Sequence, residues 1–81
     1  PRFAAGHNAR GVVLTRLGDL DDAFGVFEYA EELAPTEPGI RLNMAIVRYL
    51  QGRRHEASVI YRQVLEMEPA YQGYLDALEV E

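Results

Sequence analysis

The sequence repeats itself at an offset of 34 residues, and this internal repeat restricts the possible folds more than any other feature. Conservative pairs such as Val26 with Ile60 and Phe27 with Tyr61 accompany the residues that recur unchanged. A period of about 20 to 50 residues is typical of proteins that stack one supersecondary unit on the next. A third, incomplete copy begins near Gln72. The identical pairs include Val13 and Val47, Gly18 and Gly52, Ala23 and Ala57, Glu32 and Glu66, Pro35 and Pro69, and Gly39 and Gly73.

Glycine and proline divide each copy into two helices. Gly18 and Gly52 each follow a stretch of helical apolar periodicity and suit the left-handed conformation that ends a helix, and Pro35 and Pro69 each close the next helix. Asp19 is expected to be the N-cap of the second helix, and Thr36 or Glu37 the N-cap of the third. The pattern predicts about five helices, at residues 3–17, 20–33, 37–51, 54–67 and 71–80.

These residues resemble the tetratricopeptide repeat (TPR) family, whose unit is 34 residues long. Small residues stand where the two helices of a TPR hairpin come closest, and aromatic residues fill the family's aromatic slot. The resemblance implies an all-α, right-handed solenoid of antiparallel helical hairpins. It also implies one domain over 1–81, made of repeats 4–37 and 38–71 and a partial repeat or capping helix 72–81. The matching residues are Gly11, Ala45, Ala23 and Ala57 in the small slots, and Phe27 and Tyr61 in the aromatic slot.

The first helix of each predicted hairpin departs from the family pattern. His7, Arg10, Arg41 and Arg48 occupy slots that usually hold large apolar residues. We expect the arginine stems to lie on apolar surface while their charged ends stay in water.

Charge and composition disfavour several classes of partner. Thirteen acidic and eight basic residues give a net charge of −5, which is the wrong sign for binding nucleic acid or an anionic membrane surface. No apolar run approaches the roughly 20 residues that span a bilayer. The absence of cysteine excludes disulfides, thiolate metal sites and cysteine nucleophiles. The expected partner is therefore a protein or peptide.

Few residues in the chain could support catalysis or bind a metal ion. Ser58, the only serine, lies three residues after His55, and the two are expected to be ordinary polar residues on an outer surface. The histidines show no metal-binding spacing, and the aspartates at 19, 21 and 22 fit a helix N-terminus. No glycine-rich phosphate loop is present. The sequence predicts no enzyme, no metal site and no cofactor.

The resemblance implies a concave groove lined by the first helices of the hairpins. Its ligand is expected to be an apolar or amphipathic peptide or helix. Only Asn43 fits the clamp with which some family members hold a C-terminal carboxylate, and Leu42 and Leu50 also fit ordinary core positions. The implied groove residues are Asn8, Val12, Thr15, Arg16, Leu42, Asn43, Ile46, Tyr49 and Leu50, followed by Asp76 and Val80 of the last helix.

Self-association is the alternative function. Tyr71, Tyr74, Leu75 and Leu78 form an apolar stripe with helical spacing, which is typical of a capping helix that ends a solenoid. Two and a half repeats are nevertheless fewer than the three or so that such folds usually need. A homo-oligomer formed through open hairpin surfaces therefore remains a second hypothesis beside the peptide-binding module.

Overall fold

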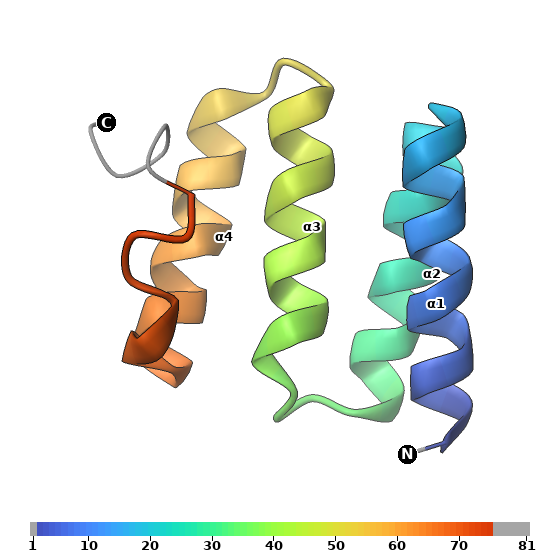
Figure 1. Ribbon diagram of the computed structural model, residues 1–81, viewed down its shortest axis with the longest axis horizontal. Helices are drawn as coiled ribbons and strands as arrows, with labels where there is room; N and C mark the ends of the chain where they lie inside the picture. Colours follow the sequence, from blue (N-terminus) through green and yellow to red (C-terminus); the bar gives the residue numbers. More distant parts are fainter. Residues whose placement is uncertain (1, 76–81) are drawn as a thin grey trace.

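The computed structural model describes residues 2–75, and they form four α-helices in two antiparallel hairpins (Figure 1). The described residues contain no strand, so the predicted all-α fold is confirmed. A short 3-10 helix, η1, follows the second hairpin. The elements are α1 (Arg2–Leu17), α2 (Leu20–Leu33), α3 (Pro38–Leu50), α4 (Arg54–Met67) and η1 (Pro69–Tyr71).

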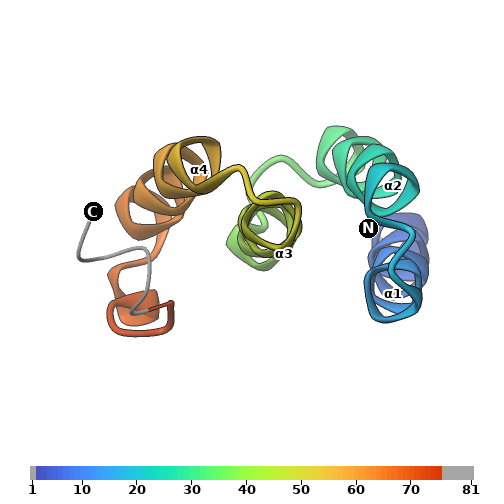
Figure 2. The ribbon, with the colours of Figure 1, turned by 90° about the horizontal axis from the view of Figure 1, so that it is seen from above.

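The helices form a shallow arch when seen from above (Figure 2). Helices α2 and α4 lie on the outer, convex side, and α3 lies between them on the inner side. Helix α1 and the segment around η1 stand at the two ends of the inner side. The molecule measures 33 × 25 × 15 Å, so each helix lies close to the surface. This arrangement matches the predicted stacking of helical hairpins.

Two glycines end the first helix of each hairpin in the same way. Gly18 and Gly52 have φ angles of +85° and +81°, a region that disfavours side chains with a Cβ. The amides of Gly18 and Gly52 donate to the carbonyls of Thr15 and Tyr49, at 3.1 and 3.0 Å. The predicted glycine turns are therefore confirmed in both copies.

The expected capping side chains do not cap their helices. Asp19 and Glu37 occupy the N-cap positions of α2 and α3, but neither side chain accepts a capping hydrogen bond within the described chain. Asp21 and Asp22 do lie in the first turn of α2, where the helix dipole favours negative charge. Helix starts here depend on tertiary packing more than on side-chain caps.

The core consists of two clusters that the internal repeat places in equivalent positions. In the first hairpin, Ala23 and Phe27 of α2 are buried, and Phe27 lies against Gly11 of α1. A Cβ built on Gly11 would lie 2.4 Å from the Phe27 ring, so the close approach requires glycine. Ala57 and Tyr61 are the buried equivalents in the second hairpin. The other members of the clusters are Ala4, Phe24, Ala30, Ile40, Met44 and Val47 in the first, and Leu42, Ala45 and Val64 in the second.

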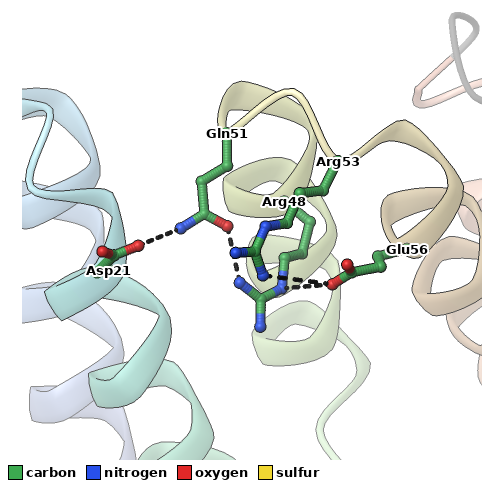
Figure 3. A network of polar contacts seen from close by, with 5 residues as sticks. All are labelled: Asp21, Arg48, Gln51, Arg53 and Glu56. Carbon is green, nitrogen blue, oxygen red and sulfur yellow. Dashed lines mark hydrogen bonds and ion pairs between the residues drawn. The ribbon is translucent and has the colours of Figure 1, made fainter.

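The charged end of Arg48 is not in water, contrary to expectation. Its guanidinium lies 3.5 Å from the centre of the Phe24 ring. It also donates to Gln51 at 2.8 Å and faces Glu56 at 3.4 Å (Figure 3). Gln51 in turn donates to Asp21 of α2 at 2.7 Å. Cation–π stacking and charged hydrogen bonds replace hydration, so the arginine joins α2, α3 and α4.

Arg41 makes a second bridge between the hairpins. It donates to Glu31 of α2 and, at 3.1 Å, to Gln63 of α4. The hydrogen bond to Glu31 raises the pKa of Arg41 above its usual value. Here too the charged end is bound by protein groups rather than by water alone.

The chain after α4 differs from the predicted helix over 71–80. Residues 69–71 form η1 and residues 72–75 form turns, because Gly73 adopts a φ of +85°. The Tyr61 hydroxyl donates to the Tyr71 carbonyl and accepts the amide of Leu75 at 3.2 Å. Tyr71 and Leu75 thereby cover the second core cluster, whereas Leu78 lies outside the described residues. A buried tyrosine fixes this segment to the outer helix.

Replacing Gly11 with alanine is expected to destabilise the fold. Overpacking a core costs about 1–3 kcal/mol, which exceeds the roughly 1 kcal/mol that alanine gains over glycine in a helix. The free energy of unfolding in urea should fall by about 1 kcal/mol. Gly25→Ala is the matched control, because no atom lies within 4 Å of the added Cβ. Equal stability of the two variants would contradict the close approach of Gly11 and Phe27.

Tyr61→Phe is expected to loosen the segment after α4. The variant loses the hydroxyl that serves both Tyr71 and Leu75, and a missing buried partner costs about 1–3 kcal/mol. Exchange of the Leu75 amide, followed by NMR, should become about tenfold faster. Tyr74→Phe is the control, since Tyr74 is 63% exposed. Unchanged exchange at Leu75 in Tyr61→Phe would show that the hydroxyl does not hold the segment.

Candidate functional site

The inner face of the arch carries two hollows, and the smaller one lies between α1 and α3. It has a volume of about 140 Å³. Phe27 of α2 contributes to its lining, and Thr15 is fixed there by a 2.7 Å hydrogen bond from its hydroxyl to the Gly11 carbonyl. Most of its lining is apolar, so it suits an apolar side chain. The remaining residues around it are Val12, Arg16, Asn43 and Ile46.

The larger hollow, of about 450 Å³, spans the inner face from α1 to the segment after α4. Tyr71 and Tyr74 form one side and contact each other edge to face, with ring centres 5.4 Å apart. A Cβ built on Gly39 would lie 3.6 Å from the Tyr71 hydroxyl, so this ring reaches the first turn of α3. The other lining residues are Ala4, Ala5, Asn8, Ala34, Glu37, Ile40, Leu42 and Asn43.

A pair of asparagines connects α1 with α3. The side-chain amide of Asn43 donates to the side-chain oxygen of Asn8 at 2.9 Å, and Asn43 borders both hollows. Among residues 2–75, this bond occupies one donor of Asn43 and one acceptor of Asn8. The Asn8 amide group and the Asn43 oxygen therefore keep hydrogen-bonding capacity. Such groups suit the backbone of a bound polypeptide.

Seven of the nine implied groove residues line these hollows. Asn8 and Leu42 border the larger one, and Asn43 borders both. Leu42 is also 5% exposed and belongs to the second core cluster, so it supports the floor of the groove more than it offers surface. Tyr49 and Leu50 line neither hollow, and Asp76 and Val80 lie outside the described residues. The four residues that border only the smaller hollow are Val12, Thr15, Arg16 and Ile46.

The sequence interpretation missed one end of the groove. Ala4 and Ala5 of α1 line one end of the larger hollow, and Tyr71 and Tyr74 line the other end. The helical spacing of the two tyrosines predicts a capping stripe, but the turn at Gly73 leaves Tyr74 exposed. The sequence feature that could have indicated this end of the groove is the pair of tyrosines shortly after Pro69. The segment there places both tyrosines in the lining of the larger hollow, together with residues of α3.

The groove carries little charge. Arg16 and Glu37 are the charged residues among those that line the two hollows in the described part of the chain. Arg16 is exposed and borders the smaller hollow, whereas Glu37 borders the larger one. With one charge of each sign at separate places, the inner face suits an uncharged, largely apolar segment better than a strongly charged one.

A further hollow, of about 540 Å³, lies at the tips of the hairpins. It is a weaker candidate for a binding site than the two hollows of the inner face, although it is larger than either. Its lining is mainly loop residues and the first turn of α2, including Asp21, Gln51 and Arg53. Gln51 already donates to Asp21, and Arg53 faces Glu56 at 3.7 Å, so these polar groups satisfy one another. No group of three metal-ligating side chains occurs anywhere in residues 2–75.

Ser58 and His55 do not form a pair on an outer surface. Ser58 is 2% exposed, and its hydroxyl has no hydrogen-bond partner among the residues described, whereas His55 is exposed. The expectation that Ser58 lies on the surface is therefore wrong, because it lies on a face of α4 that the fold covers. A buried serine and an exposed histidine offer no shared surface to a substrate.

Comparison with known proteins agrees with the geometry. The tetratricopeptide repeat family matches residues 14–79, which is most of the chain. No curated protein and no solved structure matches it. Within the described part, no helix has the length and apolar character needed to cross a membrane. The family match, the 34-residue repeat and the stacked hairpins lead to one conclusion: the chain belongs to the tetratricopeptide repeat family, whose repeats serve as protein-interaction modules.

Proposed function

We propose that the inner face binds an apolar or amphipathic segment of another protein, with no chemistry of its own. The observation that carries this proposal is the asparagine pair between two hollows, of about 140 and 450 Å³. Side chains on one face of an extended strand recur roughly every 7 Å, so one segment can fill both hollows while its backbone meets Asn8 and Asn43. A net charge of −5 supports a protein partner rather than a nucleic acid.

The expected affinity is modest. Burying a few hundred Å² of apolar surface at about 25 cal/mol per Å² gives several kcal/mol before the costs of association. A dissociation constant near 1 μM corresponds to about 8 kcal/mol, which such a groove reaches when backbone hydrogen bonds are added. Tyr49 and Leu50 are half-exposed at the far end of α3 and could extend the contact with a longer ligand.

Self-association is the second candidate function, and a specific observation favours it. Val13 of α1 is 55% exposed, whereas Val47, its equivalent one repeat later, is fully buried between the hairpins. The first hairpin thus exposes a helical face that the second hairpin uses for packing. This surface is separate from the groove, so the two functions can be tested independently.

Substituting Ala5 tests the groove. Peptides selected from a displayed random library on the immobilised protein should be rich in apolar residues and bind with micromolar affinity, measured by fluorescence anisotropy. Ala5→Glu should weaken binding of these peptides at least tenfold, because the carboxylate would lose water on contact with an apolar ligand. Ala5 is exposed on α1, so far-UV circular dichroism should stay unchanged.

Val59→Glu is the control that tests whether an added carboxylate weakens peptide binding wherever it is placed. Val59 is exposed on α4 and lines neither hollow of the inner face, so it should tolerate glutamate without loss of peptide affinity. Equal weakening by both variants would indicate a nonspecific charge effect. Full affinity in Ala5→Glu would show that the selected peptides bind elsewhere.

A further inference from the structure

The α1–α2 hairpin stands at one end of the arch and has a side that faces away from α3 (Figure 2). We call this side the end face. A shallow hollow of about 520 Å³ crosses it, with Leu14 and Val26 among its apolar lining residues. His7 and Tyr29 form one side of the hollow and contact each other edge to face, with ring centres 4.9 Å apart. Leu17, 68% exposed, lies one turn beyond Leu14 on the same helix.

The internal repeat relates the end face to an equivalent helical face that is buried elsewhere in the molecule. Arg10 and Val13 of α1 correspond to Met44 and Val47 of α3, at the offset of 34 residues. Met44 and Val47 are buried because α3 packs on α2. The helical face that joins the two hairpins is therefore exposed on α1, and the end face continues the geometry of an interface that already exists in the molecule.

The opposite end of the arch is already covered in part by the described segment after α4. Tyr71 and Leu75 pack on the second core cluster there, and the Tyr61 hydroxyl bonds to both of their backbones. Head-to-tail stacking would require this segment to leave. A symmetric pairing of two end faces requires no such displacement.

Charge on the end face is arranged for a symmetric pairing. Its α1 side carries the exposed Arg10, and its α2 side carries Asp21 and Asp22 at the helix start. Within residues 2–75, neither Arg10 nor Asp22 has an ion-pair partner. A two-fold axis that runs along the hairpin, between α1 and α2, places α1 of one copy over α2 of the other. Each basic side then faces an acidic side.

We propose that a second copy of this chain covers the end face, with Leu14, Leu17 and Val26 at the centre of the contact and Arg10 opposite Asp22 of the other copy. This inference rests on self-association, the second candidate function, and gives it a surface and a symmetry. Isologous pairing is the commonest arrangement of homodimers, and exposed apolar patches rimmed by charge are typical of such contacts.

Sedimentation velocity of the whole chain between about 5 and 500 μM tests the proposal, because interfaces of modest size give dissociation constants in that range. The wild type should change from monomer to dimer. Arg10→Glu and Asp22→Arg should each weaken the dimer at least tenfold, since each places like charges together. The double variant Arg10→Glu/Asp22→Arg restores opposite charges and should recover the wild-type dissociation constant within about threefold.

Arg62→Glu is the matched control, because Arg62 is exposed on α4 at a distance from the end face. It should leave the dimer unchanged, and all variants should retain the wild-type circular dichroism spectrum. A wild type that stays monomeric throughout would overturn self-association itself. A dimer that resists both single charge changes would leave self-association standing but overturn the end face as its surface. Growth into larger assemblies would contradict the two-fold symmetry.

Discussion

The architecture depends on the close packing of an aromatic ring against a small residue where two helices of a hairpin meet. Phe27 is almost fully buried, and its ring occupies the space that a side chain on Gly11 would need. Tyr61 is the buried ring of the second hairpin. Burying each ring contributes roughly 1.5–3 kcal/mol, and the helices approach closely enough for the next hairpin to pack beside them. Without this contact, neither the arch nor its inner face would form.

Arginines then fix how the two hairpins are joined. Arg48 stacks on Phe24 and bonds to Gln51, and Arg41 bonds to Glu31. Both positions usually hold apolar residues in this family, so polar and cation–π contacts replace part of the usual hydrophobic packing between repeats. Directional bonds of this kind hold a preferred geometry between α2, α3 and α4.

The inner face combines a small apolar hollow and a larger hollow of mixed polar and apolar lining with an amide pair between them, and its chemistry follows from that combination. Apolar hollows favour association through the hydrophobic effect but discriminate poorly among apolar side chains. Asn8 and Asn43 add hydrogen-bonding groups of the kind that can pair with a peptide backbone. The inner face is therefore suited to a class of segments, and the end face of the first hairpin is a separate surface with its own charge pattern.

The sequence by itself predicted the all-α fold class, four of its five expected helices and the glycine turns, because a 34-residue period and local punctuation are encoded in short stretches of chain. Seven of the nine groove residues that it implied also line the two hollows. Only the tertiary structure decided the rest. Leu42 has the spacing of a groove residue but packs into the core, and the arginine partners come from other helices. The segment after α4 turns at Gly73, and Tyr71 and Tyr74 line the larger hollow. Burial and pairing depend on neighbours distant in sequence, which periodicity does not specify.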